Sequence, residues 1–265
     1  MMFSGNALAE DFEYHPALSD NFVFTVGAFK SDNFFEISAE GTAPIGNDID
    51  FGNSLGVDES STLVNAGVRW KFGKNRKWSL WGQYFSNDAS GEAVLNEDVE
   101  WQDIIFREGT FVGAGVNVEI TRVLIGRSIV KNKQHDFGIG IGIHNLDVSA
   151  YIEGNISIND ESTDFFRGDA NKSQPLPNLG FWYNYSPARK WLLQGRVDWI
   201  SAEIGDYDGT LWNTTLGVNY QAFRHVGFSL SYQYFNLNLN VNSSDWKGGI
   251  DLRYRGPVLA VTGNW

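Results

Sequence analysis

The 265-residue sequence contains no cysteine and only two methionines, and it has no long run of uncharged apolar residues. The absence of cysteine excludes a disulfide framework, a thiolate metal site and a cysteine nucleophile. A membrane-spanning helix needs roughly 18 or more consecutive apolar residues, and no stretch of this chain approaches that length. If the chain crosses a membrane, it must do so as a closed β-barrel, the only other architecture that satisfies every backbone group in lipid.

Positive charge is also scarce. The chain has 20 lysines and arginines against 32 aspartates and glutamates, which gives a formal net charge of −12. Nucleic-acid binding requires a basic face that replaces the counterions of the phosphate backbone, and the sequence shows no basic stripe. The glycine-rich run G-I-G-I-G at 138–142 is not a phosphate loop, because no helix follows it. The composition therefore argues against nucleic acid as a partner, and we expect no cofactor.

Apolar residues recur with a period of two in every clear segment, and no segment carries a helical stripe over three turns. In residues 61–72, one face consists of Thr62, Val64, Ala66, Val68, Trp70 and Phe72. Residues 137–143 alternate isoleucine or phenylalanine with glycine, so one side there has no side chains, and we expect a bulky residue of a neighbouring strand to fill the space. The pattern predicts an all-β fold of antiparallel hairpins in a single domain, residues 20–265.

The last stretch of the chain combines this alternation with a terminal aromatic residue. Ile250, Leu252 and Tyr254 share one face, charged residues occupy the other, and the sequence ends at Trp265. This stretch resembles the closing strand of small Gram-negative outer-membrane β-barrels of the OmpA and OmpW kind. The resemblance covers residues 20–265 as architecture and transfers no functional residue. It implies a closed, antiparallel, up-and-down transmembrane β-barrel in an outer membrane, with lipid and lipopolysaccharide around it and the barrel-assembly machinery recognising the strand that ends at Trp265.

Two kinds of connection alternate along the chain, and such barrels have short periplasmic turns, longer outer loops and an even number of strands. The short, mostly basic turns lie at 73–77, 131–135, 187–190 and 222–225, and the longer or more acidic connections at 42–60, 87–108, 155–173, 205–208 and 241–245. If the first and last segments are each one long kinked strand, the barrel has ten strands and both ends lie on the short-turn side. If each is a hairpin, it has twelve. We predict ten.

The apolar face changes phase near Ser31-Asp32, near 119–122, after His144 and at Gly256-Pro257. The first and last of these positions lie at similar distances from their chain ends, and those strands pair in a closed barrel. Two matched β-bulges would explain both changes, because proline lacks the donor that a regular ladder requires. A bulge is also expected near His144.

Alternation alone does not say which face points inward, so a soluble barrel or sandwich with an apolar interior remains the alternative. The polar faces contain both signs of charge, as a lumen filled by ion pairs requires. We therefore predict apolar residues facing lipid and a narrow, largely filled lumen with the charge network Arg69, Lys71, Arg196, Asp198, Asp251, Arg253 and Arg255. Aromatic residues near the strand ends predict a membrane-interface girdle of Trp70, Trp78, Tyr183, Tyr185, Trp191, Trp199, Trp212, Tyr220 and Tyr232.

The first residues allow two interpretations. Ala7-Leu8-Ala9 has the small-x-small pattern that precedes a signal-peptidase site, but the apolar core of a signal is missing. Residues 1–19 are therefore either an overhang or the remnant of an export signal.

Function is less determined than fold. The predicted barrel would act as a structural or surface-loop protein, or as a porin-like route for small solutes. A hydrolase on the same scaffold is an alternative: His144 has Asp147 and Ser149 nearby, although residues an odd number apart face opposite sides of a strand. A soluble ligand-binding β-protein is the third hypothesis. Acidic loops around 97–100 and 160–164 could bind Ca²⁺ or Mg²⁺, but they lack EF-hand spacing, and no catalytic or metal residue is assigned.

Overall fold

The computed structural model describes residues 13–40, 49–58, 60–101, 104–158, 162–204, 207–242 and 247–265. The proposed signal remnant at 1–9 and the acidic positions 160 and 161 lie outside these ranges. No helix within them is long and apolar enough to cross a membrane. The elements are η1 (Pro16–Leu18), β1 (Phe22–Glu40), β2 (Ile49–Asp50), β3 (Ser60–Phe72), η2 (Lys74–Arg76), β4 (Trp78–Val94), β5 (Val99–Trp101), β6 (Ile104–Phe106), β7 (Phe111–Lys131), β8 (His135–Ile158), β9 (Ser162–Ala188), β10 (Trp191–Ile204), β11 (Tyr207–Gln221), β12 (Val226–Asn242) and β13 (Lys247–Asn264).

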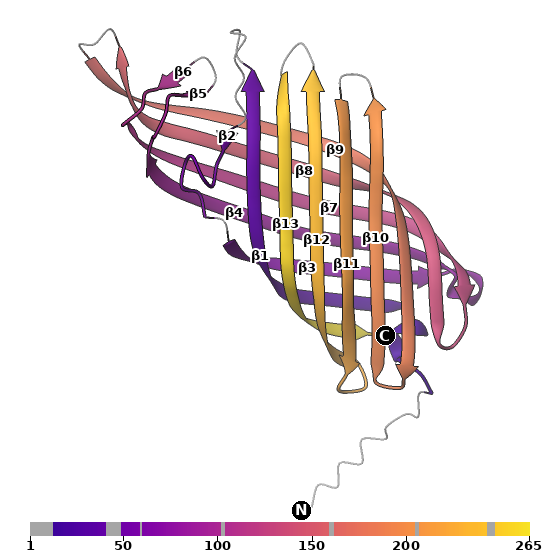
Figure 1. Cartoon of the computed structure of the whole chain (residues 1–265). Helices are drawn as coiled ribbons and strands as arrows, with labels where there is room; N and C mark the ends of the chain where they lie inside the picture. The colour runs from indigo at the N-terminus through magenta and orange to yellow at the C-terminus, as the bar shows by residue number, and fades with distance from the viewer. Residues whose placement is uncertain are drawn as a thin grey trace, which may run out of the picture.

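Ten of these strands form a closed antiparallel barrel, in the order β1, β3, β4, β7, β8, β9, β10, β11, β12 and β13. The barrel closes where β1 pairs with β13, from Val23 opposite Asn264 to Glu40 opposite Lys247. The prediction of ten strands is confirmed, and the alternative of twelve is wrong. Both described ends of the barrel, at β1 and β13, lie at the end where the short turns are (Figure 1). We call the half of the barrel near these ends the proximal half and the other the distal half.

The predicted bulges at the phase changes are wrong. Phe29 lies opposite Val258 and Asp32 lies opposite Arg255, so the register of β1 and β13 is the same on both sides of the kink. The kink does lie at matched height in the two strands. A Cβ at Gly256, whose φ is +155°, would lie 2.0 Å from the Lys30 carbonyl oxygen, so only glycine fits there. The pairing of β7 with β8 is also continuous through His144.

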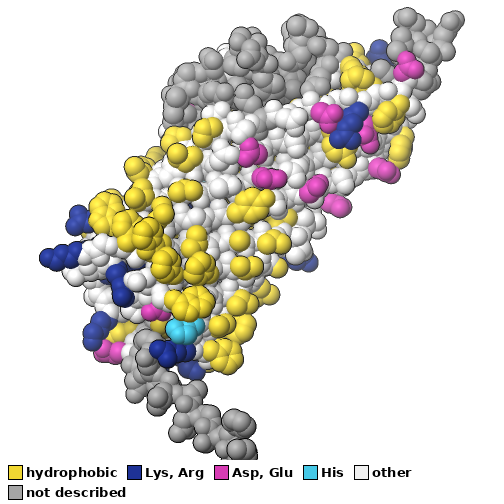
Figure 2. Space-filling view, turned by 180° about the vertical axis from the view of Figure 1, so that it is seen from behind, with side chains coloured by type: hydrophobic (Ala, Val, Ile, Leu, Met, Phe, Trp, Pro, Cys, Tyr) yellow, Lys and Arg dark blue, Asp and Glu magenta, His cyan; other side chains and the backbone are white. Residues whose placement is uncertain are grey.

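At these positions the apolar side chains change from the outer to the inner surface of the barrel wall. In β1, Phe24 in the proximal half points outward and is 45 % exposed, whereas Phe35 in the distal half points inward and is 2 % exposed. Three other strands repeat the exchange: outward Ile125, Ile141 and Leu259 give way to buried Val116, Val148 and Leu252 in β7, β8 and β13. Figure 2 shows apolar side chains gathered on the proximal part of one face and acidic side chains on its distal part.

Strand length explains why one barrel has two kinds of wall. β7, β8 and β9 contain 21, 24 and 27 residues, whereas crossing a bilayer takes about 9–11 residues per strand. The distal half is therefore free to adopt the arrangement of a water-soluble barrel, with apolar residues inside. For this reason the predicted polar loop at 155–173 is wrong. β8 and β9 pair as far as Ile158 and Ser162, and the polar residues there lie on a strand whose outer face is hydrophilic.

The distal interior is an apolar core. The ring of Phe85 makes edge contacts with those of Phe29, Phe235 and Tyr254, at centroid distances of 6.4, 6.1 and 5.9 Å. Two connecting segments add to this core from the distal end. Phe51 and Trp101 are fully buried, with ring centroids 5.7 Å apart. Within the connection predicted at 87–108, β5 and β6 form a hairpin whose Trp101 and Phe106 are buried in this core.

The barrel wall is split on one side of its distal half. The pairing of β10 with β9 stops at Trp199 opposite Leu179, although β9 continues to pair with β8. Pro175 and Pro177 lie just beyond this point on β9, and proline lacks the backbone donor that a regular ladder requires. The split opens onto a space of about 300 Å³ whose side chains include Leu176, Ile200, Leu211, Leu237 and Leu239.

The glycine run of β8 packs as predicted. A Cβ at Gly138 would lie 2.1 Å from the Trp182 ring, and one at Gly140 would lie 2.8 Å from the Leu124 side chain. Large inward residues of the neighbouring strands β9 and β7 therefore occupy this space. The run places Trp182 against the centre of the proximal lumen, where its ring lies 6.0 Å from that of Trp81.

Candidate functional site

The lumen of the proximal half is the candidate functional site, and a buried ion network lies at its centre. Asp198 on β10 is fully buried and accepts hydrogen bonds from Arg122 on β7 at 2.5 Å and from Arg196 at 2.8 and 3.0 Å. The alternation of each strand directs all of these side chains inward. One carboxylate therefore holds two guanidinium groups, one from its own strand and one from β7, with β8 and β9 between these two strands.

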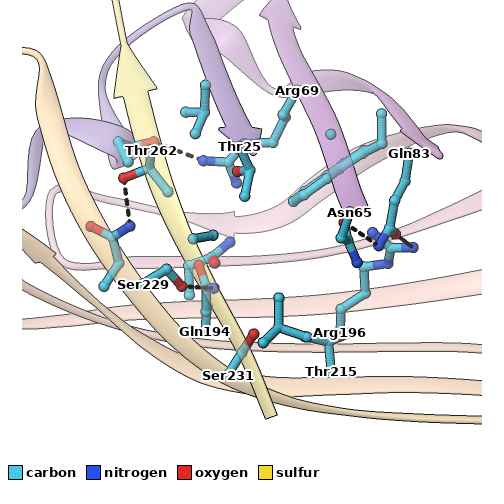
Figure 3. A pocket seen from close by; sticks show the side chains of 18 of the residues that line it. Thr25, Asn65, Arg69, Gln83, Gln194, Arg196, Thr215, Ser229, Ser231 and Thr262 are labelled. Atoms are coloured by element: carbon cyan, nitrogen blue, oxygen red, sulfur yellow. Dashed lines mark hydrogen bonds between the residues drawn. The ribbon is translucent and has the colours of Figure 1, made fainter. Parts of the chain in front are cut away.

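Neutral side chains extend this network across the lumen. Arg196 donates to Gln83 at 3.1 Å, Gln83 donates to Asn65 at 3.3 Å, and Asn65 donates to Gln233 at 3.2 Å (Figure 3). On the other side, Asn178 donates to Asp198 at 3.4 Å. The network links β3, β4, β9, β10 and β12, so it joins the two sides of the barrel.

A second charged cluster lies nearer the proximal rim. Arg69 and Lys71 on β3 are almost completely buried, as is Asp136 on β8. Asp136 accepts from Ser128 at 2.7 Å and from the Trp182 indole at 3.3 Å. This carboxylate is anchored by neutral donors, and the two cations obtain most of their hydrogen bonds elsewhere.

Those bonds come from the segment before β1, which folds into the proximal mouth. Arg69 donates to the carbonyl oxygen of Ala17 at 2.8 Å, and Lys71 donates to those of Ala17 and of Leu18, the latter at 3.0 Å. We call residues 13–19 the plug. The expectation that residues 1–19 are an overhang is wrong for this part, because buried cations require acceptors and the carbonyl oxygens of η1 supply them.

His15 holds the plug to the wall. Its ring accepts a hydrogen bond from the Ala17 backbone at 3.2 Å, so the other ring nitrogen donates to Asn219 at 3.0 Å. Its backbone N–H donates to Ser186 at 2.9 Å. Burial, with smaller effects of Arg69 and Lys71, lowers the pKa of His15 from 6.5 to about 4, against the opposing hydrogen bond to Asn219. His15 is therefore neutral at pH 7.

We expect stability to fall as the pH is lowered from 6.5 towards 4. The unfolded chain binds a proton at its histidine first, so the contribution of neutral His15 is complete above pH 6.5 and is lost on acidification. The pKa difference corresponds to at most roughly 3 kcal/mol. Equilibrium unfolding in detergent as a function of pH measures this effect, and His15→Gln should give a flatter profile than wild type. Parallel profiles would contradict the assignment.

A cavity of about 150 Å³ lies between the two charged clusters. Apolar residues such as Val23, Leu192 and Val258 form part of its lining. The polar side chains of the lining come from several strands, as Figure 3 shows, and include Thr25, Asn65, Arg69, Gln83, Gln194, Arg196, Thr215, Ser229, Ser231 and Thr262. Ala17 of the plug lines it from the proximal side. The space is large enough for several water molecules or one small ligand.

The structure places four of the seven predicted lumen charges inside the barrel: Arg69, Lys71, Arg196 and Asp198. The other three, Asp251, Arg253 and Arg255, lie on the outer face of the distal half, and their assignment to the lumen was wrong. Arg253 bonds Asp251 there, with 49 % of its side chain exposed. The same alternation that buries Leu252 and Tyr254 turns these three charges outward.

Two lumen charges, Arg122 and Asp136, escaped the sequence analysis. Arg122 falls where the apolar face changes sides, and a bulge was expected there instead of continued alternation. Asp136 lies between the predicted turn at 131–135 and the alternating segment at 137–143, and it was assigned to neither. Strand alternation could have identified Arg122. When β7 is treated as one continuous strand, the even-numbered residues Val116, Ile120, Arg122 and Leu124 all face inward.

The hypothetical catalytic grouping does not form. His144 is fully buried in the lumen, with Asn178 3.1 Å and Asn213 3.3 Å from its ring nitrogens. Asp147 and Ser149 lie at the outward positions of β8, since the alternation through this strand is unbroken. In the described ranges there is also no group of three or more histidine or carboxylate residues that could hold a metal ion.

The predicted girdle residues all lie at outward positions of their strands, and most are between 36 and 52 % exposed: Trp70, Trp78, Tyr183, Trp191, Trp199, Trp212, Tyr220 and Tyr232. Tyr185 is partly covered, because His135 stacks on its ring at 4.8 Å. Several of them pair across strands: Trp191 lies opposite Tyr220, and Trp199 lies opposite Trp212.

Comparison with solved structures identifies the architecture. The outer-membrane protease OmpT from Escherichia coli superposes with a TM-score of 0.60 over 97 % of this chain and 99 % of that chain, at 9 % identity. The chain has the fold of an outer-membrane β-barrel. The translocator domain of the autotransporter NalP from Neisseria meningitidis also matches, with a TM-score of 0.49 at 12 % identity over 94 % of this chain and 91 % of that chain.

Other comparisons add no function to this fold. The toluene transporter TodX from Pseudomonas putida gives a TM-score of 0.39 at 6 % identity, over 93 % of this chain and 90 % of that chain. No family model matches the sequence. No curated protein matches it either. At such identities the likeness concerns the fold, and the resemblance to small Gram-negative outer-membrane barrels holds at that level.

Proposed function

We propose that this barrel is an outer-membrane protein of a Gram-negative bacterium with a closed lumen, acting as a structural and surface protein of the envelope. The observation that carries the proposal is the exchange of apolar and polar faces between the two halves. The proximal half presents apolar side chains outward and ion pairs inward, which suits lipid. The distal half does the reverse, which suits water. The fold shared with OmpT and other outer-membrane proteins supports the same location.

The aromatic residues support the position of the membrane. On β10, Trp191 and Trp199 point outward and are eight residues apart, each beside an aromatic partner on β11. Eight residues of strand span roughly 26 Å, or about 20 Å after the usual tilt, close to the apolar band of such barrels. We infer that these two levels form the two interfaces of an aromatic girdle, with lipid and lipopolysaccharide as neighbours.

The first test places a charge at two heights on one strand face. Ile141→Arg puts a cation on the outward face of the proximal half, and we expect it to cost about 2–4 kcal/mol in bilayers. Ser149→Arg makes a comparable change eight residues along the same outward face, in the distal half, and should cost less than about 0.5 kcal/mol. Reversible unfolding in lipid vesicles measures both. Equal costs would contradict the proposed membrane position.

The second part of the proposal is that the lumen is closed, and three features support it. The plug fills the proximal mouth, the Asp198 network crosses the centre, and the aromatic core fills the distal half. We therefore expect the wild-type protein to show no single-channel conductance in planar bilayers. Deletion of residues 1–19 should also give none, because the core and the network remain. Reproducible conductance steps from wild type would favour a small-solute pore instead.

The remaining partner is the machinery that inserts such barrels. We infer that it recognises β13 together with Trp265, the residue that follows it. The ring of Trp265 is 56 % exposed and packs against that of Phe24 at 5.9 Å. A hydrolase is less supported, because the neighbours of His144 are amides. A soluble carrier is less supported as well, because it would leave the outward isoleucines of the proximal half in water.

A further inference from the structure

The proximal lumen contains more positive than negative charge. Among the described residues, the buried cations are Arg69, Lys71, Arg122 and Arg196, and the buried carboxylates are Asp136 and Asp198. At the rim, the half-exposed Lys131 and Asp20 offset each other. Two positive charges are therefore left without a carboxylate, in a protein whose overall formal charge is −12. Buried charge of this kind is costly unless an opposite charge accompanies it.

Two of these cations line the cavity between the clusters, namely Arg69 and Arg196. Arg69 and Arg196 both lie over the ring of Trp81, at 4.7 and 5.6 Å from its centroid. Arg196 is neutralised by Asp198, whereas Arg69 has a backbone carbonyl as its hydrogen-bond partner and, in the described part of the chain, no carboxylate within 4.0 Å. Arg69 therefore brings to the cavity wall a charge that no described carboxylate contacts directly, because Asp136 acts on it from beyond 4.0 Å and acts on Lys71 as well.

The buried polar atoms of the cavity wall that lack a hydrogen-bond partner are all of one chemical type. Four of the lining residues have buried nitrogen atoms without a hydrogen-bond partner: Arg69 Nε, Trp81 Nε1, Asn184 Nδ2 and Gln233 Nε2. All four are donors, and no buried acceptor lining the cavity lacks a partner within the described residues. Arg69, Asn184 and Gln233 are each no more than 4 % exposed. Water could bond these donors, but it brings no charge to offset that of Arg69, whereas an anion accepts from every side and supplies the charge.

We propose that this cavity is a binding site for one small inorganic anion of the size of chloride. A space of about 150 Å³ admits one small anion and is too small for a lipid. Arg69 supplies the charge, and Trp81, Asn184 and Gln233 supply neutral donors. Ala17 closes the site from the proximal side, so the plug and the anion bury Arg69 together. The bound anion neutralises one of the two excess charges and couples the plug to the wall.

Thermal unfolding in detergent tests this site with chloride as the probe and gluconate, which is too large for the cavity, as the reference anion. At constant ionic strength, raising chloride from 10 to 300 mM should raise the melting temperature of wild type by about 3 °C or more. Gln233→Glu replaces an unpartnered nitrogen with a carboxylate oxygen and keeps the acceptor for Asn65. This variant should melt higher than wild type in gluconate and should lose the response to chloride.

Gln134→Glu adds the same charge in the short turn between β7 and β8, outside the cavity lining, and is the matched control, so it should respond to chloride as wild type does. An equal chloride response in wild type and Gln233→Glu would overturn the proposal, as would a lack of response in wild type. If Gln233→Glu does not fold, anomalous diffraction from wild-type crystals in bromide decides. A bromide peak within hydrogen-bond distance of Trp81 and Arg69 supports the site, and water alone at that position refutes it.

Discussion

Replacing Asp198 with asparagine is expected to lower the free energy of unfolding by about 3–5 kcal/mol, one of the two largest effects of any single change considered for this barrel. The substitution keeps the shape of the side chain and removes its charge. Arg122 and Arg196 would then remain buried, 2 % and 15 % exposed, without the carboxylate that both now bond. The loss comes from leaving these two cations buried without a counter-charge. The intact pair itself contributes little, because the cost of desolvating its charges offsets most of their attraction.

The matched control is Asp251→Asn, which breaks an ion pair with Arg253 on the outer face of the distal half. Exposed pairs of this kind contribute about 1 kcal/mol or less. Urea unfolding of both variants in the same lipid vesicles gives the comparison. A loss near 1 kcal/mol for both would show that the lumen is hydrated enough to screen its charges. The double variant Arg122→Met/Asp198→Leu removes one cation together with the carboxylate. If it recovers part of the lost unfolding free energy, a buried charge without a counter-charge is confirmed as the cause.

Replacing Phe35 with alanine should cost about 3–5 kcal/mol, while the same change at its neighbour Phe34 should cost about 1 kcal/mol or less. Phe35 is 2 % exposed and its ring meets that of Tyr254 edge-on at 5.7 Å. Phe34 points outward on the same strand, where the Arg253 guanidinium lies 4.5 Å from its ring centroid. The first change leaves a cavity in the distal core, and the second removes one surface contact.

This pair separates two models of the wall. If a bulge at residues 30–32 kept the apolar face of β1 turned to lipid, Phe35 would face the bilayer and Phe34 the lumen. With unbroken alternation, Phe35 belongs to the core. Equilibrium unfolding of Phe35→Ala and Phe34→Ala in vesicles measures the difference directly. A larger loss for Phe34→Ala would reverse the orientation of the distal half described here.

Much of the fold could be predicted from the chain alone, because a period of two is a local property of a strand. The alternation, the short turns and the matched kinks near Ser31 and Gly256 were sufficient for a closed barrel of ten strands. The lumen residues Arg69, Arg196 and Asp198 also followed from alternation, since they lie on strands whose outward face is apolar next to them. The filling of the glycine run in β8 followed from the missing side chains at Gly138 and Gly140.

The errors about the inner and outer faces of the barrel wall share one cause. A change of apolar phase was interpreted as a change in the backbone, as a bulge is, and so Asp251, Arg253 and Arg255 were placed inside. In the structure the backbone continues unchanged and the surroundings change from lipid to water. Local sequence cannot distinguish these cases, because an inserted residue and a change of solvent produce the same shift in pattern. Strand pairing over the whole barrel distinguishes them, since a bulge alters the register and a change of solvent does not.

The sequence by itself determined the strands, their number and the faces of each strand, because those depend on residues that are near neighbours along the chain. Only the tertiary structure decided which face is inside at each height, that the plug supplies acceptors to Arg69 and Lys71, and that Arg122 shares Asp198 with Arg196. These features join residues up to 76 positions apart. Their physical reason is burial: a cation removed from water takes whichever acceptor closure of the barrel brings to it, however distant in the chain.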